Sequence, residues 1–156
     1  MDKLLRMLLG LGVVAVLSAT QIGGCDLPES DDEIQIPNFT GTFSGTNLAV
    51  DCTIGATTTT SFTLTTYTIT LSQSGGNVAG TITGTDGVNA YAGALTGTIS
   101  GMTLTITSFT LTGGGCDITA AGSGTLNGNT LTFTVSGTAT GCCVTGTISI
   151  SGAATR

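Results

Sequence analysis

The sequence predicts an all-β protein whose folded part is an eight-stranded antiparallel barrel, built as an up-and-down meander. Three observations favour this fold class. Segments such as 102–107 (MTLTIT) and 129–137 (NTLTFTVSG) alternate apolar residues with threonine, and this two-residue period is typical of half-buried strands. Glycine and asparagine, which form turns, separate the segments at short intervals. No proline follows Pro37, as expected where every segment joins a hydrogen-bonded ladder.

An export signal precedes the barrel. Lys3 and Arg6 form a basic head, the apolar stretch 7–19 follows, and small residues then lead to Cys25. A basic head, an apolar stretch of about 7–15 residues and a small-residue exit are the parts of a secretory signal. The alternative is a membrane-spanning anchor, which needs about 20 predominantly apolar residues. The apolar stretch is too short to favour that alternative.

The residues Ile22-Gly23-Gly24-Cys25 resemble the cleavage box of bacterial lipoproteins, in which an aliphatic residue and two small residues precede a cysteine. The resemblance implies a signal peptide over 1–24, cleavage before Cys25, diacylglycerol on the Cys25 sulfur and often a further acyl chain on its amine. Two or more acyl chains anchor a protein stably, since each buried methylene adds about 0.8 kcal/mol. The protein is therefore expected in the cell envelope, membrane-anchored at Cys25 and facing the periplasm or the exterior.

The segment 25–38 carries the expected lipid and then an acidic tether. Five of the 13 residues in 26–38 are acidic and two are proline, so the segment cannot bury enough apolar surface to fold alone. Its like charge would push it outward from an anionic membrane. Asp26 resembles the inner-membrane retention signal of enteric-type envelopes, and the choice between inner and outer membrane stays open.

The barrel domain is expected over 39–156, within the usual size of one domain. Turn residues at 75–77, 101 and 127–129 separate its strands. The strands are predicted, in order, at 39–51, 59–72, 77–85, 90–100, 102–112, 116–126, 129–138 and 142–151. Pairing the first strand with the last removes two unprotected edges, which favours closure. A β-sandwich is the alternative, because eight short strands suit it too.

The alternation of apolar residues slips by one position in three strands. In 59–72 the apolar residues are even-numbered up to Leu64 and odd-numbered from Tyr67 onwards. The same change of parity occurs within 39–51 and 102–112. One extra residue returns both halves to the same face. We therefore predict β-bulges near Thr65-Thr66, Thr107-Ser108 and Thr46-Asn47.

The alternation also predicts which side chains fill the interior. The inward-facing set is Leu64, Ile69, Leu71, Ile82, Leu95, Ile99, Leu104, Ile106, Leu111, Leu131, Phe133, Val135, Ile148 and Ile150. Glycines within strands are expected to ease the strong coiling of a narrow barrel. They include Gly45, Gly84, Gly97 and Gly146.

Four cysteines are expected at one rim of the barrel. If strands alternate in direction, Cys52 ends the first strand, Cys116 begins the sixth, and Cys142 and Cys143 lie between the last two. Neighbouring strands then favour the disulfides Cys52–Cys143 and Cys116–Cys142. The swapped pairing is the first alternative, and a strained bond between Cys142 and Cys143 is the second. An exported chain has the oxidising compartment these bonds need. A cysteine metal site is disfavoured, since the usual two-residue gap and histidine are missing. No metal or cofactor is expected.

Gly41-Thr42-Phe43 and Arg156 resemble, weakly, a feature of the lipocalin- and avidin-like barrels known as calycins. Those proteins carry Gly-x-Trp early in the first strand and an arginine near the last strand. The resemblance implies that Arg156 packs across Phe43 as a barrel-floor pair, with Phe43 in place of the tryptophan. The phrase 74–84 (SGGNVAGTITG) is similar to those of exported bacterial β-barrel domains rich in Gly and Thr.

Charge and composition exclude some functions. After Cys25 the chain has no lysine, and Arg156 is its one cation, so there is no basic footprint for nucleic acid. Rows of threonine resemble the arrays of ice-binding proteins, but those arrays need a flatness that narrow barrels lack.

An enzyme is not expected, because the barrel offers few groups for proton transfer. Its candidates are Asp51, Asp86, Asp117, Tyr67 and Tyr91. The three aspartates are predicted at the cysteine rim, where they could form paired carboxylates or a calcium site. The favoured interpretation is that they cap turns and keep the surface soluble.

The sequence therefore predicts a non-enzymatic cell-envelope lipoprotein whose barrel is an interaction or structural module. Its partners would be the membrane, through the N-terminal lipid, and an envelope protein or glycan. The alternative is lipocalin-like binding of a small apolar ligand in the barrel mouth, since barrel mouths are common ligand sites.

Overall fold

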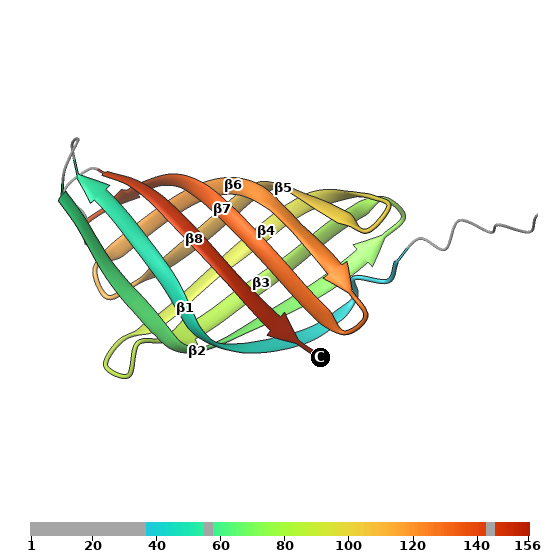
Figure 1. Ribbon diagram of the computed structural model, residues 1–156, viewed down its shortest axis with the longest axis horizontal. Coiled ribbons are helices and arrows are strands. Elements are labelled where there is room, and N and C mark those ends of the chain that lie inside the picture. The colour runs from blue at the N-terminus through green and yellow to red at the C-terminus, as the bar shows by residue number, and fades with distance from the viewer. Residues whose placement is uncertain (1–36, 55–57, 143–145) are drawn as a thin grey trace, which may run out of the picture. The chain divides into compact units, whose positions relative to one another are not determined.

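The computed structural model describes residues 37–54, 58–142 and 146–156, and it shows a closed antiparallel barrel (Figure 1). The strands are β1 (Gly41–Ile54), β2 (Thr58–Ser74), β3 (Asn77–Thr85), β4 (Ala90–Ser100), β5 (Thr103–Gly113), β6 (Cys116–Asn127), β7 (Thr130–Thr140) and β8 (Gly146–Thr155). Each strand pairs with the next along the chain, and β1 pairs with β8. The predicted meander barrel is confirmed, and the β-sandwich alternative is wrong. Within the described ranges, no helix is long and apolar enough to cross a membrane.

The strand predicted at 142–151 is the one whose position is wrong, since β8 runs from Gly146 to Thr155. Its inward-facing positions continue past Ile150 through Gly152 to the buried Ala154. Glycine and alanine carry too little apolar surface to show as alternation in a sequence. The strand therefore extends four residues beyond its predicted end.

The first predicted bulge lies in β1, at the closing seam of the barrel. The buried residues change from odd-numbered at Phe43 to even-numbered at Leu48. The register against β8 shifts between Ser44 and Ala49. Asn47 takes a φ of 56°, a left-handed conformation that asparagine tolerates better than most residues.

The other two predicted irregularities are also present. In β5 the buried face changes between Ile106 and Phe109, and the register shifts there against both β4 and β6. In β2 the buried face changes between Leu64 and Tyr67. The register between β1 and β2 is unbroken, because their irregularities lie opposite each other. The parity of apolar residues thus located all three changes of face.

The interior is a single apolar cluster formed by all the strands. Every residue predicted to face inward is buried except Ile99, which is partly buried against the cluster. Among the described residues, no polar or charged side chain is buried. The cluster also includes small residues at inward positions, such as Ala120, Ala139 and Ala154.

Glycines at inward positions let neighbouring strands approach closely. Gly93 lies between Ile82 on β3 and Leu111 on β5, so a large residue flanks it on each side. A Cβ atom at Gly93 would overlap the carbonyl oxygen of Thr110. The same holds, with a carbonyl oxygen under 3.0 Å away, for Gly80, Gly84, Gly97, Gly122 and Gly137. Large residues beside glycine fill a narrow barrel whose strands coil strongly.

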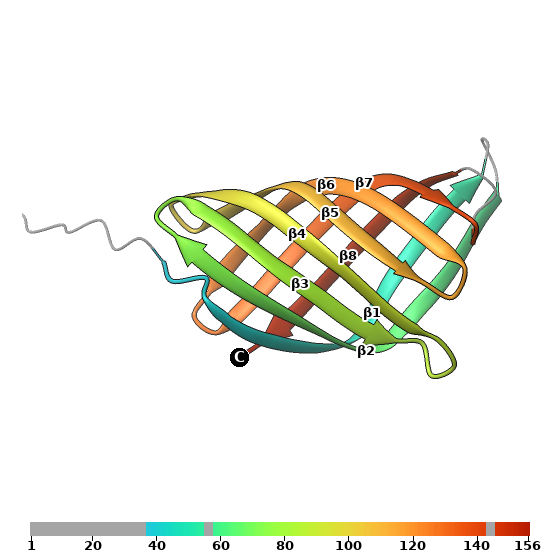
Figure 2. The same cartoon turned by 180° about the vertical axis from the view of Figure 1, so that it is seen from behind.

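A row of threonine side chains, interrupted only by Ala94, winds around the outside of the barrel. Following cross-strand partners from β1, the row is Thr42, Thr70, Thr81, Ala94, Thr110, Thr119, Thr138, Thr147 and Thr53. It returns to β1 near the other end of that strand, so the ladder is strongly staggered, and stagger requires tilted strands. The tilt is visible from both sides (Figures 1 and 2). The row is therefore helical, which disfavours a flat ice-binding array.

Candidate functional site

The cysteine rim is the end of the barrel where β1, β3, β5 and β7 finish and the even-numbered strands begin. Cys116, the first residue of β6, forms a disulfide with Cys142, which follows β7. This predicted bond is confirmed. Cys52 is also disulfide-bonded. Its predicted partner Cys143 lies outside the described residues, so that pairing stays a prediction.

Asp86 organises the β3–β4 loop at this rim through four hydrogen bonds. Oδ1 of Asp86 accepts hydrogen bonds from the backbone N–H groups of Val88 (2.8 Å) and Asn89 (2.6 Å). Oδ2 accepts from the Asn89 side chain (3.0 Å) and from the Tyr91 hydroxyl (2.9 Å). The hydroxyl of Thr85 accepts a further bond from the loop backbone. The prediction that rim aspartates cap turns is thus confirmed for Asp86.

These bonds fix the protonation states of the loop. Hydrogen bonds from Asn89, first through its side chain and then its backbone, and from Val88 hold the pKa of Asp86 well below its ordinary value. Burial, and then the hydrogen bond to the ionised Asp86, raises the pKa of Tyr91. Near neutral pH the carboxylate stays ionised and the phenol stays protonated. Neither group then has the pKa near working pH that acid–base catalysis requires.

Tyr91 connects this loop to the barrel interior. Its ring is buried and stacks on Phe62 of β2, with ring centroids 5.4 Å apart and an interplanar angle of 17°. The hydroxyl of the same side chain reaches Asp86. A chain of contacts therefore runs from the apolar core to the tip of the rim.

The other two rim aspartates are placed differently from the prediction. Asp51 lies within β1 and Asp117 within β6, and both are exposed on the outer face of their strands. They pair with strand residues, so the turn-capping interpretation is wrong for them. Over the described ranges, His, Cys, Asp and Glu nowhere gather in a group of three that could hold a metal ion.

The barrel floor is the opposite end, where the chain enters β1 and leaves β8. The Arg156 guanidinium lies over the Phe43 ring, with Cζ 5.2 Å from the ring centroid. Nη1 of Arg156 donates to the carbonyl oxygens of Asn38 (2.9 Å) and Thr40 (2.7 Å). The pair that the calycin resemblance implies is therefore in contact, and it also fastens the segment that leads into β1.

A second clasp holds the same entering segment. Oε1 of Gln73, on β2, accepts a hydrogen bond from the backbone N–H of Phe39 (2.7 Å), whose ring is fully buried. The backbone N–H of Gln73 donates to the Thr40 hydroxyl (3.1 Å). Phe39 and Thr40 are therefore held in place at the floor, just before β1 begins.

Shallow grooves lie on the outer wall of the barrel. One, of about 580 Å³, follows the seam between β1 and β8, where the ladder has no paired residues between Ser44 and Ala49. Tyr67 fills this gap from the inside, and its hydroxyl donates to the carbonyl oxygen of Ala153 (2.6 Å). Hydroxyl, small and aromatic residues line the groove: Ser44, Gly45, Thr46, Thr66, Tyr67, Thr68, Ala153 and Thr155.

Several predicted site residues lie outside the part of the chain that the structure describes. They are the proposed lipid attachment residue Cys25, the cleavage-box residues Ile22, Gly23 and Gly24, and Cys143. Sequence reasoning missed the roles of Asn89 and Gln73. An Asp-Gly-Val-Asn run signals a capped turn, and this signal was available at residues 86–89. No comparable motif in the sequence indicates the hydrogen bond between Gln73 and Phe39.

Comparison with known proteins adds no family to this description. No protein-family model matches the chain, and a search of curated proteins finds no match.

Proposed function

We propose that this protein is a non-enzymatic lipoprotein of the cell envelope that displays a rigid barrel as an interaction or structural module. The observation that carries the proposal is the apolar cluster of inward-facing side chains. The described inward-facing side chains belong to this one cluster, and both carboxylate oxygens of Asp86 accept hydrogen bonds, from its own loop and from Tyr91 on β4. Such a barrel suits the presentation of a fixed outer surface.

The anchoring part of the proposal rests on the N-terminal sequence. Ile22-Gly23-Gly24-Cys25 supports acylation of Cys25, and two or more acyl chains give stable membrane attachment. The chain enters the barrel at the floor, where Arg156 holds Asn38 and Thr40. This arrangement supports a barrel whose cysteine rim points away from the membrane.

The small-ligand alternative gains no support from the inward-facing side chains that the structure describes. A lipocalin-like carrier needs space inside the barrel for its ligand. Phe43, Phe109 and Phe133 are all buried in the cluster that occupies this region. The groove along the β1–β8 seam is lined mainly by residues that carry hydroxyl groups, which do not favour an apolar ligand.

The anchor is tested by exchanging Cys25 for serine. In the native host, we expect wild-type protein in the membrane fraction, released only by detergent, and its mature N-terminal peptide to carry acyl mass on Cys25. The Cys25→Ser variant should be uncleaved or released as a soluble chain. Asp26→Asn is the matched control and should remain acylated. A mature wild-type chain that begins at any residue other than an acylated Cys25 would contradict the proposal.

A further inference from the structure

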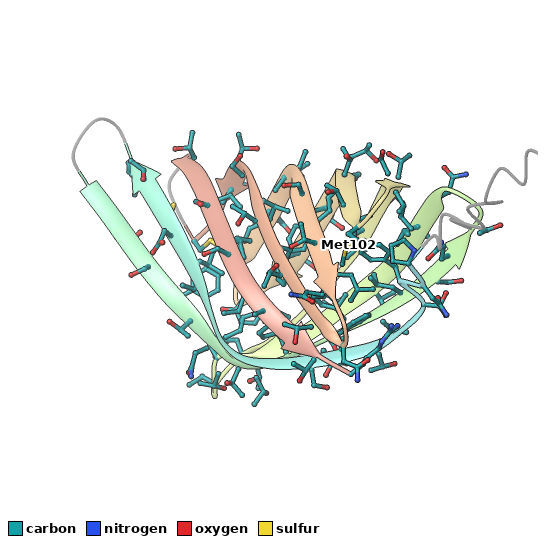
Figure 3. The ribbon with its side chains drawn as sticks, turned by 45° about the vertical axis from the view of Figure 1, so that its right-hand side comes forward. Met102 is labelled. Carbon is teal, nitrogen blue, oxygen red and sulfur yellow. A yellow bond between two sulfur atoms is a disulfide. The ribbon has the colours of Figure 1, made fainter. Side chains whose placement is uncertain are left out.

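One large apolar side chain is almost fully exposed at the cysteine rim. Val88, in the β3–β4 loop, is 90 % exposed. The other large apolar side chain that the described ranges leave exposed is Met102, at 55 %, in the β4–β5 turn at the barrel floor (Figure 3). A single exposed apolar residue is ordinary on a protein surface, so Val88 becomes informative only through its surroundings.

The first such feature is that the loop holds Val88 in one position. Its backbone N–H donates to Asp86, as does that of Asn89, and Asp86 is tied through Tyr91 to the core. The loop between β3 and β4 bends outward at this end of the barrel (Figures 1 and 2). By contrast, the β5–β6 turn consists of Gly114 and Gly115, which present no side chain. The fold therefore presents Val88 on a preorganised support.

The second feature is the separation of charge along the barrel. Asp51, Asp86 and Asp117 all lie at the cysteine rim, and Arg156 lies at the floor. From residue 39 onwards the sequence has no other charged side chain. Val88 is thus an apolar tip at the end of the barrel that carries the three carboxylates, and such an end is complementary to an apolar socket bordered by lysine or arginine.

We propose that the β3–β4 loop docks a partner protein, with Val88 entering an apolar socket bordered by basic side chains. The inference rests on the proposed function as an interaction module and assigns the surface that interacts. A preorganised loop loses little conformational freedom on binding, so less of the binding free energy is lost to ordering the loop. The acidic rim adds attraction at a distance, which accelerates encounter and weakens as salt is raised.

The test uses the full-length chain in intact cells of its native host. A photo-crosslinking amino acid replaces Ala90, an exposed residue beside the loop, and in a separate chain it replaces Met102 as the matched control. We expect one discrete protein adduct from position 90 and none of the same mass from position 102. The crosslinked partner peptide, mapped by mass spectrometry, should combine apolar residues with lysine or arginine.

Val88→Thr in the position-90 chain is the decisive variant, because threonine keeps the β-branched shape and replaces one methyl with a hydroxyl. We expect about a tenfold lower adduct yield, since a buried hydroxyl without a partner is costly. The unfolding midpoint should be unchanged. An unchanged adduct yield would overturn the inference.

The remaining outcomes separate this inference from the proposed function. Adducts from position 102 alone would place the interaction at the floor. The absence of adducts from both positions would show that the β3–β4 loop does not dock a partner protein. Both results refute the inference while leaving the membrane anchor intact. Wild-type protein found soluble and unacylated in the same cells would instead refute the proposed function.

Discussion

Gly93→Ala should destabilise the barrel strongly, although it adds one methyl group to a strand. A Cβ at this position would overlap the carbonyl oxygen of Thr110 and press on the backbone of Leu111. Strands β4 and β5 must then separate locally. Overpacking of a filled core costs about 1–3 kcal/mol, and a lost ladder hydrogen bond costs about 1 kcal/mol. Alanine lowers the conformational entropy of the unfolded chain, which offsets about 0.4–1 kcal/mol, so the expected net loss is about 1–4 kcal/mol.

Gly76→Ala is the matched control for this prediction. It lies in the β2–β3 turn, where an added Cβ has Ile99 O, at 4.0 Å, as its nearest neighbour. We expect this variant to be neutral or stabilised by about 0.4–1 kcal/mol. Urea unfolding with the disulfides intact measures both variants. For a slope of about 2 kcal/mol per molar, the middle of the usual range, Gly93→Ala should lower the urea midpoint by about 0.5–2 M. A Gly93→Ala midpoint equal to that of Gly76→Ala would refute the close-approach argument.

Two further predictions concern hydrogen bonds at the seam and the rim. Tyr67→Phe should lower the free energy of unfolding by about 1–2 kcal/mol, because the carbonyl oxygen of Ala153 loses its donor at the β1–β8 gap; an unchanged urea midpoint would count against this. Asp86 has a pKa lowered in the folded state, so its contribution is present above the unfolded pKa of about 4 and is lost as pH falls further toward the folded pKa. The stability difference between wild type and Asp86→Asn should therefore be constant from about pH 7 to 5 and shrink below about pH 4; a difference that grows on acidification would show that the linkage has the opposite sign.

The strands and their irregularities could be predicted because large apolar side chains mark the inward face directly. The change of parity between Leu64 and Tyr67 is visible in the sequence, and the same two residues show where β2 changes face. Cys116 and Cys142 became a predicted pair once the strand order was set, since β6 and β7 are neighbours. Periodicity and topology together were sufficient for these features.

Other features could not be predicted, because they depend on small residues or on single hydrogen bonds that leave no periodic pattern in the sequence. The inward positions at the end of β8 are Gly152 and Ala154, which read as neutral in an alternation of large and polar residues. The clasp of Gln73 on Phe39 joins residues 34 apart through one side-chain oxygen. Its geometry follows only after the register of β1 and β2 is fixed. The role of Asn89 could be predicted in part. The Asp-Gly-Val-Asn motif indicates a turn, but the hydrogen bond from the Asn89 side chain to Asp86 depends on the conformation of the loop.

The threonine row leaves the barrel wall polar without being ionic. Between Asp51 and Asp117 near one end and Arg156 at the other, its outward-facing residues are mainly threonine, serine and alanine. Ions screen charges and act little on neutral hydroxyl groups. The hydration of this wall should therefore change little between dilute and saline media, while within the barrel the charged side chains at the two ends respond to ionic strength.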